Sequence, residues 1–252
     1  MYRAPRLVIA GLMTLVVVAG WCYSAWSESD PRVISIEAGG SVACVLLADR
    51  MAKCWGDNRN GELGNGTRTH AVSPVQVSGL SEVSMITTRG GHSCAVLTDG
   101  AVRCWGANTR GQVGISNKAD DVLLPTPVAG LTSATAIASG LLHTCAVLRD
   151  GTVRCWGGNS YGQLGNGTTT DSLKPVVVKK IGSAVAVTAG EEHTCALLRE
   201  GTVVCWGHNR FGMLGSDTLK ISAEPVMVPG LISVVGETKR GQESLLSRSG
   251  RR

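Results

Sequence analysis

Residues 143–157 read "HTCAVLRDGTVRCWG", with two cysteines ten positions apart around an Asp-Gly pair and a Trp-Gly pair at the end. A near copy, "HSCAVLTDGAVRCWG", begins at His92, and another, "HTCALLREGTVVCWG", begins at His193. Copies of one motif at a fixed period indicate a repeat architecture, in which each repeat contributes one supersecondary unit. The organisation of the chain therefore follows from the length of this period.

The Trp-Gly pair marks the period. It occurs four times, at spacings of 50, 51 and 50 residues, with its tryptophans at Trp55, Trp105, Trp156 and Trp206. After each pair come a glycine-containing turn, a variable polar loop, and a proline followed by an apolar run. Within the region 28–231, the predicted repeating units cover residues 31–80, 81–131, 132–181 and 182–231.

Each unit has the pattern of short β-strands. "AVAVTAG", from Ala184, alternates as a strand does, and "HTCAVL" and "TVRCWG" form a predicted hairpin through "RDG". "PVVV", from Pro175, is a predicted fourth strand with its proline at the start, where a missing N–H is tolerated. Four short strands per repeat of about 50 residues are typical of a propeller blade. We predict an all-β fold, a β-propeller of about four blades with four short antiparallel strands in each.

The pattern "GxxHxCAxLxxGxVxCWGxNxxGxLG" resembles the repeat of the regulator of chromosome condensation family, also called alpha-tubulin suppressor-like repeats, in its exported bacterial form. The resemblance covers residues 31–231 and implies a propeller, usually of seven blades. Because this chain has four full units, we expect a partial or truncated relative, with 232–252 as an incomplete fifth repeat and basic tail. The first unit departs from the pattern at Val42, in place of histidine, and at Arg50, in place of the turn glycine.

Eight of the nine cysteines belong to the repeat: Cys44, Cys54, Cys94, Cys104, Cys145, Cys155, Cys195 and Cys205. If Arg149, Asp150 and Gly151 form a three-residue hairpin loop, stepping outward in twos places Cys145 opposite Cys155. Opposed residues of an antiparallel pair have Cα atoms roughly 4.5–5.5 Å apart, a distance that a disulfide can bridge. We predict one disulfide per unit. Reduced packing cysteines and a metal site are the alternatives.

Three units carry a histidine two residues before the first cysteine: His92, His143 and His193. On a strand the two side chains share a face, so histidine and both cysteines could converge on a metal ion. Zinc sites, however, usually show paired short spacings such as C-x₂-C, and the unit offers no clear fourth ligand. We expect each histidine to be a structural residue that bonds a neighbouring backbone group. We expect the four tryptophans to pack between blades.

Residues 1–27 have the pattern of a targeting segment. Arg3 and Arg6 precede the apolar run "LVIAGLMTLVVVAG", and small residues follow that offer a signal-peptide cleavage site. The apolar stretch is also long enough to remain uncleaved as a signal anchor. Either reading predicts an exported protein, extracellular or periplasmic, with membrane contact only through this segment if it is uncleaved. Cleavage would remove Cys22 and leave an even set of cysteines, as a disulfide framework requires.

Charge and repetition together exclude several function classes. Residues 28–231 carry 17 basic and 17 acidic residues, whereas nucleic-acid-binding domains cluster Lys and Arg on their folded surface; no nucleic-acid partner is expected. Catalysis needs an asymmetric group of residues, but nearly every His, Cys and Asp recurs once per unit. His70 and His208 do not recur, and we interpret them as standing alone. We therefore expect no catalytic residues, no metal and no cofactor.

Non-repeating residues concentrate in the loops before the prolines: 65–73, 115–124, 166–174 and 216–224. We expect these loops on one rim, as a variable surface on a rigid frame, and mixed charges such as Lys118 beside Asp120 and Asp121 suit a protein partner.

The predicted function is a non-catalytic, exported protein-binding scaffold, for example an enzyme inhibitor, whose partner and binding residues the sequence does not identify. The alternatives are guanine-nucleotide exchange on a small GTPase, which the resemblance implies, and a hydrolase or carbohydrate-acting propeller. Open blade faces predict in addition that the chain associates with a partner or with itself.

Overall fold

In the computed structural model of the chain, residues 32–116 and 121–231 are described. The predicted signal segment 1–27, the loop residues Lys118 and Asp120, and the predicted tail 232–252 lie outside them. The described residues form strands, turns and loops, and none of them belongs to a helix that is long and apolar enough to cross a membrane.

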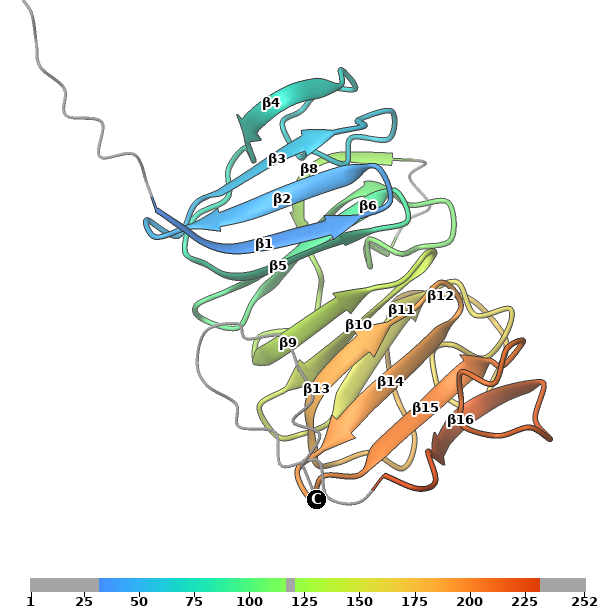
Figure 1. Ribbon diagram of the computed structural model, residues 1–252. Coiled ribbons are helices and arrows are strands. Elements are labelled where there is room, and N and C mark those ends of the chain that lie inside the picture. Colours follow the sequence, from blue (N-terminus) through green and yellow to red (C-terminus); the bar gives the residue numbers. More distant parts are fainter. Residues whose placement is uncertain (1–31, 117–120, 232–252) are drawn as a thin grey trace, which may run out of the picture. The chain divides into compact units, whose positions relative to one another are not determined.

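The strands form four antiparallel sheets of four strands each, which we call blades 1 to 4 in chain order (Figure 1). Blade 1 consists of β1 (Val33–Gly39), β2 (Val42–Leu47), β3 (Ala52–Gly56) and β4 (Ala71–Gln76). Blade 2 consists of β5 (Val83–Arg89), β6 (His92–Leu97), β7 (Val102–Ala107) and β8 (Asp121–Pro127). Blade 3 consists of β9 (Ala134–Ser139), β10 (His143–Leu148), β11 (Val153–Gly157) and β12 (Ser172–Val177). Blade 4 consists of β13 (Ala184–Ala189), β14 (His193–Leu198), β15 (Val203–His208) and β16 (Ile221–Met227). The strands of each blade pair in sequence order, which confirms the predicted all-β propeller of four-stranded antiparallel blades.

The central hairpin of each blade has the predicted three-residue loop. In blade 3, Leu148 N donates to Thr152 O (2.8 Å), and Gly151, with a φ of 82°, donates its N–H to Leu148 O (2.9 Å). A positive φ at this position favours glycine because it has no Cβ. In blade 1 the position is Arg50, which adopts a φ of 64°. The loop therefore keeps its length in all four blades, and the cysteines face each other across every hairpin.

The fourth strand begins before its proline and not at it. In blade 3, β12 starts at Ser172, three residues ahead of Pro175. β12 is the outer strand of its blade, so one of its edges has no neighbouring strand within that sheet. A proline, which lacks the N–H, is tolerated within such an edge strand. The sequence therefore predicted the strand correctly but placed its start too late.

The core consists of buried clusters between successive blades, and each cluster contains the tryptophan of the later blade. Trp105 of blade 2 belongs to the same buried cluster as Leu63 and Val77 of blade 1. Trp156 of blade 3 packs in the same way on blade 2, and Trp206 of blade 4 packs on blade 3. All three indoles are fully buried. The hydrophobic stabilisation of blades 1 to 3 therefore depends on the blade that follows each of them.

Candidate protein-binding rim

The loop between the third and fourth strands leaves every blade at the same end of the sheet. In blade 3, His143 at the start of β10 is opposite Gly157 at the end of β11. The loop that follows β11 therefore begins beside the turn that joins β9 to β10. The described residues of the four loops are 57–70, 108–116, 158–171 and 209–220, and we call them the loop rim.

Main-chain hydrogen bonds join a loop of one blade to the outer strand of the next. Gly66 N donates to Leu123 O of blade 2 (3.1 Å), and Gly167 N donates to Ala223 O of blade 4 (2.9 Å). Each contact links segments about fifty residues apart, so the variable stretches that the sequence singled out lie next to one another along the rim.

A buried asparagine organises each loop from inside. Asn58 accepts a hydrogen bond from Leu63 N through Oδ1 (2.9 Å), and its Nδ2 donates to the carbonyls of Thr67 and Thr69 (3.0 Å each). The equivalent residues are Asn108, Asn159 and Asn209, each of which accepts the same bond from the residue five positions on. Buried polar groups of this kind fix the conformation of a loop, because any other loop conformation would leave buried backbone groups without hydrogen-bond partners. Sequence reasoning gave this asparagine no role, although its position three residues after each repeated tryptophan was the available signal.

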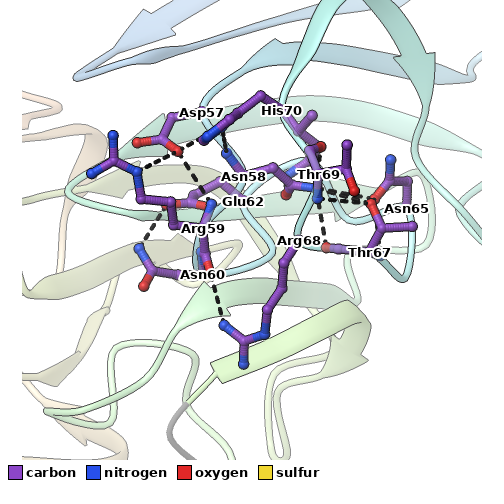
Figure 2. A network of polar contacts seen from close by, with 11 residues as sticks. Asp57, Asn58, Arg59, Asn60, Glu62, Asn65, Thr67, Arg68, Thr69 and His70 are labelled. Atoms are coloured by element: carbon purple, nitrogen blue, oxygen red, sulfur yellow. Dashed lines mark hydrogen bonds and ion pairs between the residues drawn. The ribbon is translucent and has the colours of Figure 1, made fainter.

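Charged side chains of blade 1 form a network above this framework, which Figure 2 shows. Asp57 Oδ1 lies 3.0 Å from His70 Nδ1 and 3.5 Å from Arg59 Nε. Asn60 Nδ2 donates to Glu62 Oε1 (2.7 Å). His70 therefore does not stand alone as predicted, because Asp57 is brought next to it by the loop and not by proximity in sequence.

Three charged contacts join neighbouring blades at or beside the rim: Arg68 with Asp121, Arg110 with Asp171, and Lys179 and Lys180 with Glu224. The two lysines lower the pKa of the Glu224 carboxyl to about 2. All these side chains are at least partly exposed, so each pair contributes little to stability. Their effect is to orient the rim side chains. Asp121, which the sequence grouped with Lys118 and Asp120, has its partner in blade 1.

His208 is also part of a cluster. Its Nδ1 lies 2.9 Å from Glu192 Oε2, and its ring stacks on Tyr161 of blade 3 with centroids 4.3 Å apart. Next to it, Arg210 lies over the exposed ring of Phe211, with the guanidinium carbon 5.1 Å from the ring centroid. Aromatic and arginine side chains of this kind are enriched at protein interfaces. The prediction that His208 stands alone is thus wrong, since its partners come from other loops.

Hollows beside the rim are lined by side chains of mixed charge. One, of about 460 Å³, is bordered by Asp57, Glu62, Arg89 and Glu191. Within residues 32–116 and 121–231, no three His, Cys, Asp or Glu side chains are grouped so that they could hold a metal ion. The arrangement presents charges and aromatic rings for contact.

Two of the three repeated histidines, His92 and His143, lie fully buried between blades. His92 Nε2 is 2.8 Å from Thr144 Oγ1 of the next blade, and His143 Nε2 is 2.8 Å from Thr194 Oγ1. Because the Thr144 hydroxyl donates to Gln112 O (2.9 Å), its oxygen accepts from the imidazole N–H. Each of these Nε2 atoms thus has a hydroxyl partner in the next blade. Burial lowers the pKa of His92 to about 4 and of His143 to about 3, so both rings are neutral at pH 7.

The third repeated histidine, His193, is only half-buried. Burial lowers its pKa as well, and the ring borders a hollow of about 300 Å³ together with Phe211 and Met213. A methyl group on Gly190 would lie 2.1 Å from His193 Cε1. The glycine ahead of the histidine is therefore required by the close approach of the ring.

The eight repeated cysteines form four disulfides in the structure: Cys44–Cys54, Cys94–Cys104, Cys145–Cys155 and Cys195–Cys205. Their Cα atoms are 4.0–4.1 Å apart, and each bond lies within one hairpin. The cross-strand register predicted for Cys145 and Cys155 is the one observed. Sulfur atoms bonded to each other are not available as thiolate ligands, which argues against the metal alternative.

Comparison with known proteins agrees with this architecture. The regulator of chromosome condensation (RCC1) repeat matches residues 54–96, 99–147 and 150–197, and a second version of the repeat matches 33–62, 134–163 and 184–212. These matches cover more than half of the chain. The protein therefore belongs to the RCC1 repeat family.

Individual relatives share the repeat over part of their length. The ultraviolet-B receptor UVR8 of Arabidopsis thaliana is 36% identical over 145 residues, which are 56% of this chain and 33% of that protein. The E3 ubiquitin-protein ligase HERC2 of Mus musculus is 32% identical over 143 residues, 55% of this chain and 3% of the ligase. The chain thus matches a third or less of these two relatives.

Solved structures show the same fold. Yeast RCC1 (Prp20), in its complex with Kap60, superposes with a TM-score of 0.71 at 21% identity, over 79% of this chain and 49% of that one. Human WBSCR16 also superposes with a TM-score of 0.71, at 24% identity, over 79% of this chain and 53% of that one. This chain therefore spans about half of each of these propellers.

Proposed function

We propose that the protein is a non-catalytic, exported scaffold that binds a protein partner through the loop rim. The observation that carries this proposal is a contrast within each loop. The buried asparagine and its hydrogen bonds repeat from blade to blade. The two residues before the turn glycine are exposed or half-buried and differ between blades: Arg59 and Asn60, Thr109 and Arg110, Ser160 and Tyr161, Arg210 and Phe211. A rigid frame with variable tips is the general design of a recognition surface.

The chemistry of the tips favours a protein as the partner. Arg59, Arg110 and Arg210 are exposed, and Tyr161 and Phe211 add aromatic surface beside them. Arginine and aromatic residues dominate the energetics of protein interfaces. Carboxylates alternate with these cations along the rim, so a uniformly charged polyanion would be repelled at several points.

The repeat itself supplies matched variants for the test. Arg59 and Arg210 occupy the position of Ser160 in blade 3, so the double variant Arg59→Ser/Arg210→Ser copies a residue that the loop already accepts. The control is Arg149→Ser, which removes a positive charge from the hairpin at the opposite end of a blade. Chains 28–252 of each kind would be used to capture proteins from the host's envelope and medium. A partner retained by wild type and control but lost by the rim variant is expected; equal capture by all three refutes the rim as the binding surface.

Export is proposed on the basis of the disulfides. Disulfides form and persist in oxidising compartments and are rare in the cytosol, and all eight repeated cysteines are paired in the structure. Maleimide labelling of the protein as isolated from its host, before and after reduction, should show no free thiols among these eight. Eight labelled thiols without reduction would contradict export.

Nucleotide exchange on a small GTPase remains the alternative activity that the fold allows. The yeast RCC1 structure shares the fold at 21% identity, which supports the architecture alone. Adding the chain to GTPases loaded with a fluorescent nucleotide would test it. Accelerated nucleotide release would replace the scaffold proposal.

A further inference from the structure

The contact between successive blades follows one rule at all three junctions. A main-chain carbonyl in the turn of one blade accepts the indole N–H of the next blade's tryptophan. Trp105 donates to Glu62 O (2.7 Å), and the same bond joins Trp156 to Gln112 O (2.9 Å) and Trp206 to Gln163 O (2.8 Å). The junction is therefore directional, with a tryptophan on one side and a turn on the other.

A second contact accompanies the first. The turn glycine of one blade receives a side chain from the outer strand of the next: Leu123 lies against Gly61, Leu173 against Gly111 and Ala223 against Gly162. A methyl group added to any of these glycines would lie 2.5 Å from its partner residue. Each junction thus has two matched pairs, tryptophan with carbonyl and outer-strand side chain with glycine.

Blade 1 has the tryptophan and the outer-strand side chain of such a junction, but no described residue supplies the carbonyl and the turn glycine that would contact them. Trp55 is half-buried, whereas the other three repeated tryptophans are fully buried. Val72 is the counterpart of Leu123, Leu173 and Ala223, and its side chain is 99% exposed. Ile36 of β1, on the same blade, is 62% exposed.

Blade 4 has the turn glycine and the turn carbonyl of such a junction, and no described tryptophan or outer-strand side chain contacts them. A methyl group on Gly212 would meet nothing within 4 Å. A methyl group on Gly215 would meet Val228 and Pro229, whereas its counterparts in blades 1 to 3 face a tryptophan ring. The carbonyl equivalent to that of Glu62 is Met213 O. Phe211, in the same turn, is 80% exposed.

We propose that a second copy of this chain docks its blade 1 on blade 4 of the first, continuing the junction rule from one molecule to the next. Trp55 Nε1 of one copy donates to Met213 O of the other, and Val72 packs on Gly212. The structure favours a second copy as the partner for this reason. The same junction occurs three times within the chain, and the chain carries one side of it unpaired on blade 1 and the other side unpaired on blade 4. On blade 1 this interface uses Trp55 of β3 and Val72 of β4, which lie outside the rim loops, whereas on blade 4 it uses Gly212 and Met213 of the rim loop 209–220.

The junction between copies is weaker than the internal ones for a definite reason. Internally, a hydroxyl also donates to the turn carbonyl, as Thr194 does to Gln163 O (3.1 Å). Blade 1 has Ala43 at this position, so that hydrogen bond is absent, and His193 finds no hydroxyl partner there. The contact is heterologous, and such contacts either close into a ring or extend into a chain of copies. We expect reversible association and not a permanent dimer.

Analytical ultracentrifugation of oxidised 28–252 at increasing concentration tests the proposal. The wild type should form dimers or larger species in the range up to about 100 µM. Val72→Asp, at a fully exposed position that leaves the fold intact, should weaken association at least about tenfold. Gly212→Asp, on the opposite face, should do the same. Val177→Asp, the same substitution at a 46% exposed position in the outer strand β12 of blade 3, is the matched control and should associate like the wild type.

Mixing the two aspartate variants distinguishes this head-to-tail contact from other modes. Each variant retains one functional face, so the two should be monomeric alone and form one-to-one complexes together. A wild type that stays monomeric up to about 100 µM overturns the proposal. So does unchanged association of Val72→Asp, or a mixture of the two variants that forms no complex.

Discussion

Lowering the pH from 8 to 5 should reduce the free energy of unfolding by about 4 kcal/mol through His92 and His143 alone. Burial depresses the native pKa of these imidazoles from 6.5 to about 4 and about 3. The unfolded chain takes up a proton at each histidine below pH 6.5, while the native rings stay neutral. Their contribution to stability is therefore complete above pH 6.5 and is lost progressively as the pH falls toward 4 for His92 and toward 3 for His143. Because pH 5 lies about 1.5 units below the pKa of the unfolded histidine, the free energy of unfolding falls by about 2 kcal/mol per histidine at this pH.

Urea unfolding followed by tryptophan fluorescence at pH 8 and pH 5, with the disulfides intact, measures this loss. His92→Gln keeps a side-chain N–H for Thr144 but does not titrate in this range, so its pH-dependent loss should be about 2 kcal/mol smaller than that of the wild type. The double variant with His143→Gln should remove about 4 kcal/mol of pH dependence. Other acid-sensitive groups, such as Glu224, are the same in all three proteins and cancel in the comparison. An unchanged loss in His92→Gln would refute the assignment of acid sensitivity to the buried rings.

Three further variants test the framework, each by the free energy of urea unfolding. Trp156→Phe removes the N–H that bonds Gln112 O and should cost about 1–3 kcal/mol, whereas a cost near zero would contradict the junction rule. Asn159→Ala leaves the backbone groups of loop 158–171 without their buried partner and should cost about 2–3 kcal/mol; it should also speed amide hydrogen exchange in that loop, and unchanged exchange would argue against the anchoring role. Replacing Cys145 and Cys155 together by alanine should cost about 2–4 kcal/mol, and a variant as stable as the wild type would show that the hairpin disulfide contributes nothing.

The strands and hairpins could be predicted from the sequence because their determinants are local. The alternation in "AVAVTAG" and the three residues between Leu148 and Thr152 define a hairpin without reference to the rest of the chain, and the parity of that loop places Cys145 opposite Cys155. The position of Pro175 was misjudged for a related reason. Proline is excluded only where its missing N–H is needed, and this depends on which edge of the strand has a neighbour.

The polar contacts between blades, unlike the packing of the repeated tryptophans, could not be predicted in this way. The hydroxyl partner of His92 lies 52 residues away, and the partner of Asp121 lies 53 residues before it. These pairs exist because stacking brings equivalent positions of successive repeats together, a relation that a single repeat does not contain. The buried asparagines were missed although they recur, because a recurring Asn in a turn is also explained by turn formation alone.

The disulfides have a consequence for how the chain becomes oxidised. Each cysteine pairs with a partner ten residues away, while the next cysteine of the repeat is 40 or 41 residues further on. Eight cysteines can pair in on the order of 100 ways, and the native set is the one that closes the shortest loops, which costs the least chain entropy. A hairpin can therefore complete its bond as soon as it is made, before the next blade has emerged. Oxidation in the order of the polypeptide would put each bond in place before a wrong partner is available.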